Sequence, residues 1–448
     1  MNKDGRICII GGGPAGIAAA MYLQVKGYKN VEIFEREMSV GGKARGPWEL
    51  YGGDSYFALR ELEYYGESGH ALTFADLRAY RDKGGAETTP YGRDRRRAAS
   101  ALKLTGQTRK LERLLETKYK GFACYGHVGI SKGAFFGLSK EMENHLHRVR
   151  GKNRFLRDLV LPFDQFCRIN GVEEAAGLWT APLSAAGCGF PDELPAAYVL
   201  KRFDLRAVLD FHDETYWEWE EGAKSIFEAV NQRLDRPANL GTEVVRVTRT
   251  EDAVRVTVRG ETGEREERFD RLIVAAPLPA FAAYADASAE EKELFGKIRY
   301  KKAAQFLAHL SPNIAAERAG FIPENFAPEG LGHLAAWQRS DAPFWEEETV
   351  AAVAYLSHEG SRPASAGEAF TNMEAELGLF GLEASEGISE KVISGMPFVP
   401  CPDYADGWYD RLEALQGQRG TYYSGEILSA GSLEDACAAS RDLVGRFF

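Results

Sequence analysis

The sequence has no closely spaced cysteine pair and no uninterrupted apolar run long enough to cross a membrane. Its six cysteines are scattered along the chain, at Cys8, Cys124, Cys167, Cys188, Cys401 and Cys437. This spacing argues against a zinc module or a disulfide scaffold, and it predicts free thiols in a reducing cytoplasm and no metal site. Near the N-terminus, the apolar stretch at residues 7–23 is broken by glycines, which argues against a signal peptide.

The chain is also poor in positive charge. Its 448 residues carry a net charge of −11, so we expect no binding to nucleic acid through overall charge. Residues 91–160 are the exception, with 17 Lys or Arg and 6 Asp or Glu. This basic segment favours a solvated loop, and the alternatives are transient contact with an anionic membrane surface and steering of an anionic substrate. No pattern indicates an obligate protein partner.

The first 35 residues have the pattern of a dinucleotide-binding unit. A short apolar run, Ile7–Ile10, predicts a buried parallel strand, and Val31–Phe34 predicts a second one. Between them, residues 15–26 have helical spacing and are followed by Gly27, which is typical of a helix C-terminus. The order strand, loop, helix, strand within about 30 residues is the opening of a Rossmann-like fold.

The loop of this unit reads G-G-G-P-A-G at residues 11–16, which matches the pattern G-x-G-x-x-G. Gly11 permits a tight turn, Gly13 allows the backbone to approach a pyrophosphate, and Gly16 lets the helix pack closely on the strand. The N–H groups at the helix N-terminus would bind the phosphates. Glu35 ends the second strand and would accept hydrogen bonds from a ribose. The predicted cofactor ligands of this region are Gly11, Gly13, Pro14, Ala15, Gly16, Glu35 and Arg36.

A second glycine motif follows directly and favours FAD over NAD. Gly42 and Lys43 offer a close backbone approach and a cation for a further phosphate contact. A Rossmann domain that binds only NAD does not need this pair. The alternative for the motif taken alone is a plain turn with a surface lysine.

A third motif lies near the C-terminus. A short strand ends in Gly425 and Glu426, and a helix follows with Ser432 at its N-cap and Leu433 as its first residue. We expect Glu426 to bond the ribityl or pyrophosphate region of FAD. The N–H of Leu433 would face the electron-rich N1–O2 edge of the flavin.

The rest of the chain gives a coarser prediction. Residues 101–119 are expected to form a helix, and residues 242–248, 253–259 and 268–276 are expected to form a meander of three strands. Further strands are expected at residues 303–310, 332–338, 349–356 and 422–425.

With these motifs in place, the sequence resembles the monoamine-oxidase-type FAD superfamily. More narrowly, the chain resembles the bacterial flavin-dependent polyunsaturated fatty acid isomerases. The stretches that carry this resemblance are LETKYKG at 115–121, LPFDQF at 161–166, PAAYVLK at 195–201, WEWEEG at 217–222, GWY at 407–409, and residues 423–429 and 440–448. The resemblance covers most of the chain, is weak between about 50 and 110, and leaves an insertion near 129–154.

The resemblance implies an α/β fold in which a Rossmann-like FAD-binding domain is interleaved with a mixed α/β substrate domain, as in amine-oxidase-like two-domain flavoproteins. The FAD domain would comprise residues 1–75, 238–283 and 416–448, and the substrate domain residues 76–237 and 284–415. FAD would bind non-covalently, with Val244 against its adenine.

The family also implies a substrate and a reaction. The substrate would be a long apolar acid, from which a hydride passes to flavin N5 and returns at another carbon, so that a double bond moves without net redox change. Phe211 falls on the aromatic position of the family's tunnel mouth, and Arg78 or Arg81 lies near the position of its arginine. The loop that starts at Trp48 is shorter than in the family, and it would lie near the reacting carbon.

Two alternatives stay open. The first is an FAD-dependent oxidase or dehydrogenase acting on a C–C or C–N bond of a small apolar natural product or an amine. Amine-oxidising relatives carry an aromatic ring before the last helix and a lysine near flavin N5, and this chain has Ser432 and Gln305 at the corresponding positions. The second is a flavin-binding or membrane-associated protein without turnover.

Overall fold

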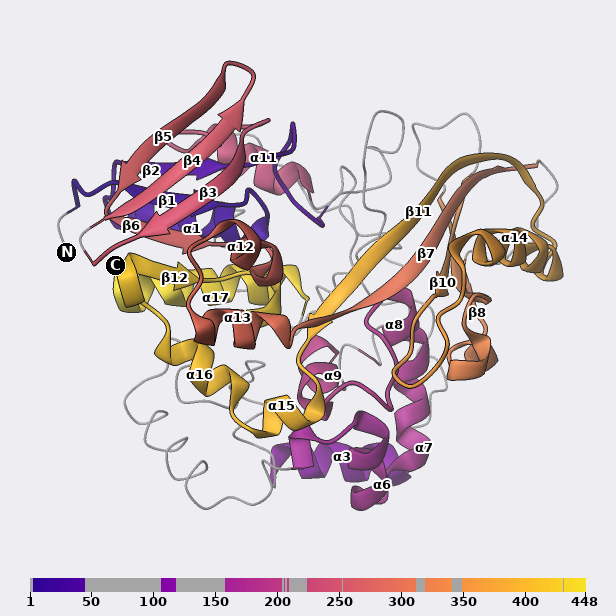
Figure 1. Ribbon diagram of the computed structural model, residues 1–448. Coiled ribbons are helices and arrows are strands. Elements are labelled where there is room, and N and C mark those ends of the chain that lie inside the picture. The colour runs from indigo at the N-terminus through magenta and orange to yellow at the C-terminus, as the bar shows by residue number, and fades with distance from the viewer. Residues whose placement is uncertain are drawn as a thin grey trace.

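The computed structural model describes three β-sheets with helices around them (Figure 1). The described residues are 3–44, 106–117, 158–203, 205, 208, 224–251, 253–311, 319–340, 349–429 and 431–448. The predicted substrate residues Trp48, Arg78 and Phe211 lie outside them, as do Arg81 and most of the basic segment 91–160. In the part of the chain that is described, no helix has the length and apolar character needed to cross a membrane.

The first sheet is four-stranded and parallel, in the order β12-β6-β1-β2. Its strands are β1 (Ile7–Ile10), β2 (Val31–Phe34), β6 (Arg271–Val274) and β12 (Thr421–Tyr423). Alternation of side chains gives the sheet two buried faces. Ile7 and Ile9 pack against helices, whereas Cys8 and Ile10 pack into the core on the opposite face. The sheet therefore confirms the predicted buried strands of the dinucleotide-binding unit.

Helices cover the first of these faces. They are α1 (Pro14–Val25), α11 (Lys224–Gln232) and α17 (Leu433–Phe447). Ile17 and Leu23 of α1 join Phe227 of α11 and Cys437 of α17 in one core. Gly27 has a φ of +89° directly after the helix, so the predicted glycine end of α1 is confirmed.

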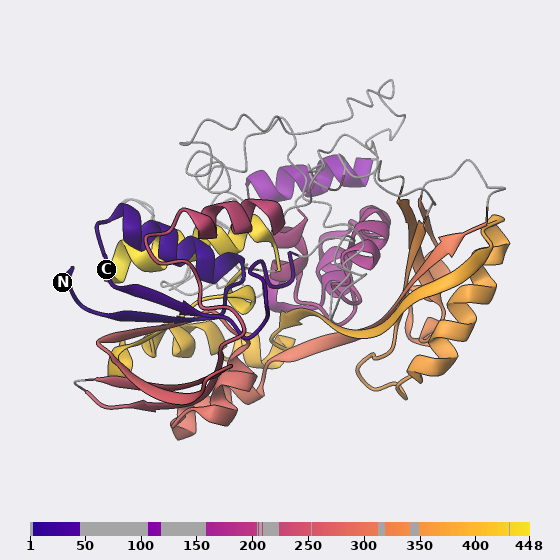
Figure 2. The same ribbon diagram turned by 90° about the horizontal axis from the view of Figure 1, so that it is seen from above.

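A second sheet covers the opposite face (Figure 2). Its antiparallel strands are β3 (Glu243–Arg249), β4 (Val254–Gly260) and β5 (Gly263–Phe269). The predicted third strand of this meander was wrong. The segment 268–276 divides at Asp270, whose carboxylate accepts a hydrogen bond from Arg6 N–H at 2.8 Å, and its apolar half is β6 of the parallel sheet. Leu272–Val274 is buried on both faces, which suits a central parallel strand.

The third sheet is antiparallel, in the order β11-β7-β10-β9-β8. Its strands are β7 (Arg299–Leu310), β8 (Ala319–Phe321), β9 (Leu334–Ser340), β10 (Thr349–Tyr355) and β11 (Ala384–Phe398). Helix α14 (Ala366–Leu377) covers one face. β7 and β11 form a long ribbon that runs back toward the first sheet (Figure 1). Sequence analysis missed β11, started β7 four residues late and placed β9 too early, because Gly332 (φ +81°) makes a turn there.

The remaining described helices are mostly short. They are α3 (Gly106–Glu116), α6 (Phe163–Asn170), α7 (Glu173–Ala176), α8 (Thr180–Ala185), α9 (Ala196–Arg202), α12 (Leu278–Tyr284), α13 (Ala289–Gly296), α15 (Cys401–Ala405) and α16 (Trp408–Ala414). Six 3₁₀ turns complete the described elements: Gly177–Trp179, Pro323–Asn325, Pro328–Gly330, Gly378–Phe380, Gln418–Gly420 and Glu426–Leu428. The predicted domain bounds stay a prediction, and α11 packs on the α1 core although it was assigned to the other domain.

A buried ionic cluster ties the C-terminal strand to the second sheet. The side chain of Arg249 on β3 is 0% exposed and donates to Glu291 of α13 at 2.6 Å and to Asp286 at 2.7 Å. Arg419 donates to Glu291 at 2.8 Å, and Tyr423 of β12 donates a short hydrogen bond to the same carboxylate. Burial alone would raise the pKa of Glu291, but the hydrogen bonds from Arg249, Tyr423 and Ser288 outweigh it and lower this pKa to about 2.

Candidate functional site

A cavity of about 380 Å³ lies at the carboxyl ends of β1 and β2, where ligands bind in open α/β sheets. It extends to the β7–β11 ribbon and to the N-terminus of α17. Of the fourteen predicted cofactor residues, thirteen line this cavity, and they come from segments as far apart as Gly11 and Leu433. The remaining one, Gly16, lies beneath its wall. The structure thus brings all the predicted cofactor residues to one place.

Two glycine loops form one wall and approach each other closely. Gly11 has a φ of +103° and Gly42 a φ of +52°, so both use backbone conformations that favour glycine. A Cβ atom added to Gly42 would lie 3.1 Å from the Cα of Gly13, and one added to Gly16 would lie 2.0 Å from the carbonyl oxygen of Gly11. The loops and the start of α1 can approach each other this closely only because these positions carry no side chain.

The N-terminus of α1 opens into this space. Gly13 is the N-cap of the helix, and no side chain caps it. Pro14 occupies the first helical position, where its missing N–H costs nothing. The N–H groups of the first turn therefore have no acceptor inside the helix, and together with the positive end of the helix dipole they suit a phosphate.

Glu35 is held in position at the end of β2 by two backbone donors. Gly12 N–H donates to its Oε2 at 2.6 Å, and Glu37 N–H donates to its Oε1 at 2.9 Å. The residue is 9% exposed and lines the cavity. Each carboxylate oxygen keeps a further lone pair, so the group can accept from a ribose diol without moving. The neighbouring Arg36 has a side chain that is 67% exposed and pairs with Glu37 at 3.0 Å.

Val244, the predicted adenine contact, lies near this end. It is the second residue of β3, is 7% exposed and lines the cavity. Thr242, Glu243 and Tyr284 line the cavity with it. The combination of a β-branched side chain, an aromatic ring and backbone at a strand end suits a planar base.

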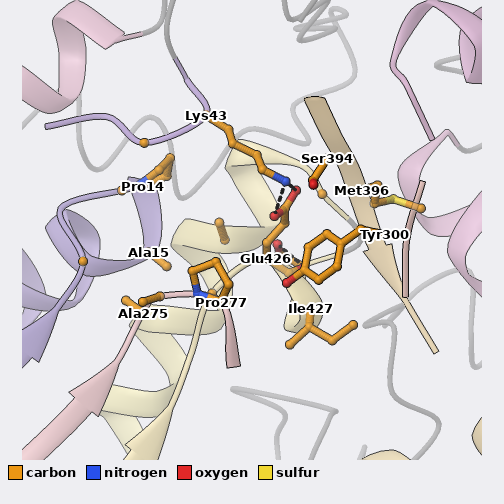
Figure 3. Close-up of a pocket in the computed structure, with 18 of the residues that line it drawn as sticks. Pro14, Ala15, Lys43, Ala275, Pro277, Tyr300, Ser394, Met396, Glu426 and Ile427 are labelled. Atoms are coloured by element: carbon orange, nitrogen blue, oxygen red, sulfur yellow. Dashed lines mark hydrogen bonds and ion pairs between the residues drawn. The ribbon is translucent and has the colours of Figure 1, made fainter. Parts of the chain in front are cut away.

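An ion pair crosses the middle of the cavity (Figure 3). Lys43 Nζ lies 2.7 Å from Glu426 Oε2 and donates to the carbonyl oxygen of Gly395 at 3.0 Å. The same ammonium lies 5.5 Å from the centre of the Tyr300 ring. Burial, followed by the charge of Glu426, raises the pKa of Tyr300, so the phenol stays neutral. Lys43 therefore joins the second glycine loop to β11 and to the C-terminal motif.

The C-terminal motif has the predicted geometry in part. Gly425 follows β12 with a φ of +102° and lies beside Ala275. Ser432 caps α17 by accepting from Asp435 N–H at 2.9 Å. The carboxylate of Asp435 pairs with Lys201 at 2.9 Å. Leu433, the first residue of α17, is buried and lines the cavity.

The far end of the cavity is mostly apolar, and sequence analysis did not find it. Phe203, Val353 and Ile393 line it, together with Cys188 and the 5% exposed Gln305. Burial raises the pKa of the Cys188 thiol to about 11, so this group is not a nucleophile at neutral pH. Cys188 lies between α8 and α9 and Phe203 directly follows α9, whereas the other three residues lie on β7, β10 and β11. No local motif links them, and only the alternation along the strands could have indicated which side chains face inward.

The comparisons with known proteins agree with this geometry. Residues 14–357 match the profile of the flavin-containing amine oxidoreductases, and the chain belongs to this family. A crystal structure of a CLA-producing fatty acid isomerase from P. acnes is 30% identical, with 100% of both chains covered and a TM-score of 0.81. A comparison with curated protein sequences gave no match.

Two amine oxidases share the fold at lower identity. Putrescine oxidase with bound putrescine is 13% identical, with 99% of this chain and 98% of that chain covered and a TM-score of 0.64. Cyclohexylamine oxidase from Brevibacterium oxydans IH-35A is 16% identical, with the same coverage and a TM-score of 0.61. The predicted fold class, an amine-oxidase-like α/β flavoprotein, is confirmed.

The cofactor of this family is FAD, and the cavity fits it. The side-chain-free loops at Gly11, Gly13 and Gly42 and the open N-terminus of α1 suit a pyrophosphate, and the fixed carboxylate of Glu35 suits a ribose. The assignment of individual residues to parts of FAD stays a prediction.

Proposed function

We propose that this protein is an FAD-dependent isomerase that moves a double bond in a long unsaturated acid. Its likeness to a fatty acid isomerase over the full length of both chains supports the reaction. The observation that carries the proposal is the apolar end of the cavity, which adjoins the predicted flavin cradle without a break. An acyl chain is the kind of substrate that such a wall binds by burial alone.

FAD, when bound, supplies hydride acceptance and return at flavin N5. The chain's own residues then have three tasks. Phe203, which is 2% exposed, helps to exclude water from the apolar end. Val353 and Ile393, on the inner face of the third sheet, fix the depth and direction of the chain. Tyr300 is neutral and Lys43 is paired with Glu426, so neither presents an unpaired charge to the substrate.

The polar end of the substrate is proposed to contact residues outside the described part of the chain. Phe211 and Arg78 are proposed to lie at the tunnel mouth and Trp48 near the reacting carbon. A substrate that is an anion, a cytoplasmic location and a transient contact of residues 91–160 with an anionic membrane are likewise proposals. The net charge of +11 within that segment supports the last of these.

One anaerobic experiment tests the reaction. The purified protein with bound FAD is mixed under argon with linoleate and other polyunsaturated fatty acids, and the ultraviolet and flavin bands are followed together. Growth of conjugated-diene absorbance over many turnovers, with the flavin oxidised at the end, is the expected result. A flavin that bleaches and stays reduced until air is admitted would favour the oxidase or dehydrogenase alternative. The absence of any spectral change with every acid would refute a fatty acid substrate.

A further inference from the structure

Gln305 is a polar side chain set into the apolar face of the third sheet. It occupies the middle of β7, directly opposite Val353 of β10 and Lys391 of β11. Side chains alternate along a strand, so Gln305 shares its face with Ala303 and Leu307, both of which belong to the central core. It is 5% exposed and lines the cavity beside Val353 and Ile393.

The amide oxygen of Gln305, Oε1, is buried and has no hydrogen-bond partner among the described residues. An orphaned buried polar group costs about 1–3 kcal/mol, and an apolar side chain of the same size would avoid that cost. If this wall bound only a hydrocarbon chain, a buried amide at this point would add a cost and no contact. The side chain therefore indicates that the substrate or the flavin brings a hydrogen-bonding group to this depth of the cavity, and the substrate is the case argued below.

The chemistry of an amide restricts what this group can be. Oε1 accepts and Nε2 donates. A carboxylate accepts only, and would leave Oε1 without a donor. The methylene and alkene carbons of a fatty acid offer neither function. A hydroxyl group can both donate to Oε1 and accept from Nε2, so it satisfies whichever side of the amide faces the cavity.

We propose that Gln305 selects unsaturated acids that carry a hydroxyl group on the acyl chain, which donates to Gln305 Oε1. The inference rests on the proposed function and makes its substrate class more specific. Gln305 is a specificity-determining residue that positions the chain against Val353 and Ile393. The hydroxyl takes no part in the bond changes, so the isomerisation itself is as proposed above.

The test uses two acids that differ by one hydroxyl, oleate and ricinoleate. Each is titrated under argon into the FAD-loaded protein, and the shift of the flavin absorbance gives its affinity. We expect ricinoleate to bind about ten-fold more tightly than oleate, the effect of one hydrogen bond in a buried site. Linoleate turnover is measured on the same preparation.

Two variants localise the effect. Gln305→Met keeps the length of the side chain and removes its hydrogen bonds, so we expect the preference for ricinoleate to disappear while oleate binds as well or better. Ile393→Ala, on the neighbouring strand of the same wall, removes apolar contact and is expected to weaken both acids by the same factor. Bound flavin and the melting temperature establish that each variant is folded. The comparison of the two acids on the unmodified protein tests the inference even if a variant does not fold.

The remaining outcomes separate this inference from the proposed function. If linoleate is isomerised but ricinoleate binds no better than oleate, the inference is wrong and the function stands. If Gln305→Met shifts the reduction potential of the flavin in the absence of any acid and leaves the preference unchanged, the partner of the amide is the flavin, and the inference is also wrong. If no acid perturbs the flavin, the proposed function fails and the inference fails with it.

Discussion

Lys43 Nζ and Glu426 Oε2 lie 2.7 Å apart although 383 residues separate them in the sequence. Their side chains are 34% and 28% exposed, and both line the cavity. An ion pair exposed to this extent adds little to the stability of the fold. Its position between the second glycine loop and the C-terminal motif instead suggests that it holds two walls of the cofactor site at a fixed distance.

We expect Lys43→Met to weaken FAD binding about ten-fold, the effect of losing one hydrogen bond to a charged group of about 1.5 kcal/mol. Quenching of flavin fluorescence on titration into apoprotein measures the affinity. In the double variant with Glu426→Gln, the loss should be smaller than the sum of the single losses, because each single change leaves the other charge unpaired. Strictly additive losses would contradict the pairing. Arg255→Ala, in an exposed pair with Glu266, should leave FAD affinity unchanged.

The close approach of Gly16 to Gly11 predicts that a side chain at residue 16 lowers the stability of the protein. A Cβ at residue 16 would lie 2.0 Å from the Gly11 carbonyl oxygen, which is backbone and cannot swing away. We expect Gly16→Ala to lower the free energy of unfolding by about 3 kcal/mol and to reduce bound flavin, as measured by urea denaturation and by absorbance.

Gly367 supplies the matched control for this change. It lies in α14, and an added Cβ would meet nothing within 4 Å. Gly367→Ala should therefore be neutral or stabilising by about 0.5–1 kcal/mol, with flavin content unchanged. Equal effects of the two substitutions would show that the close approach at Gly16 does not matter.

Sequence patterns could predict the phosphate end of the site because the residues that form it are close together in the sequence. The loop and helix between β1 and Glu35 belong to one strand–loop–helix–strand unit, and the contacts of Gly12 with Glu35 and of Gly16 with Gly11 lie within that unit. The C-terminal motif could be predicted for the same reason, since Ser432 caps the helix that begins at the next residue, through a hydrogen bond from Asp435 N–H three residues on.

The apolar end could not be predicted in this way, because it forms only when distant strands pair. β11 contains Gly395 and Pro397, which usually argue against a strand, and its register against β7 shifts at several points. The structure explains Gly395, since a Cβ there would lie 2.3 Å from the Gly187 carbonyl oxygen. Long-range pairing of this kind overrides local propensity. The direction in which Gln305 points depends on that pairing.

A prediction on substrate binding follows from Val353. It is 2% exposed and faces the apolar end of the cavity from β10. We expect Val353→Phe to fill space needed by the acyl chain, so that the fatty-acid-induced shift of the flavin spectrum is lost while flavin content stays within about 20% of that of the unmodified protein. Ala352→Val, which points to the opposite face of the same strand, tests whether a larger side chain on β10 is harmful by itself. If Val353→Phe still binds fatty acids tightly, the acyl chain does not bind against this wall.

The buried cluster around Glu291 predicts how stability depends on pH. The pKa of Glu291 is about 2 in the folded protein and 4.5 in an unfolded chain. Because the folded value is lower, its contribution is fully present above pH 4.5 and is lost as the pH falls from 4.5 to 2, by on the order of 3 kcal/mol in total. Glu291→Gln should flatten this part of the pH profile. At pH 7 the variant should be less stable by about 3–5 kcal/mol, because Arg249 has a side chain that is 0% exposed and would lose one of its two carboxylate partners.

Urea denaturation between pH 7 and pH 2 measures both effects. Glu293 is the control, since its pKa is also lowered to about 2, by hydrogen bonds from Arg411 and Lys297, but it lies on the surface. Solvent screens such a pair, so Glu293→Gln should leave the acid limb of the profile unchanged. If Glu291→Gln and Glu293→Gln flatten the pH profile of stability equally, burial of the Glu291 cluster is not the cause of the pH dependence. If neither does, the acid dependence of the fold arises at other carboxylates.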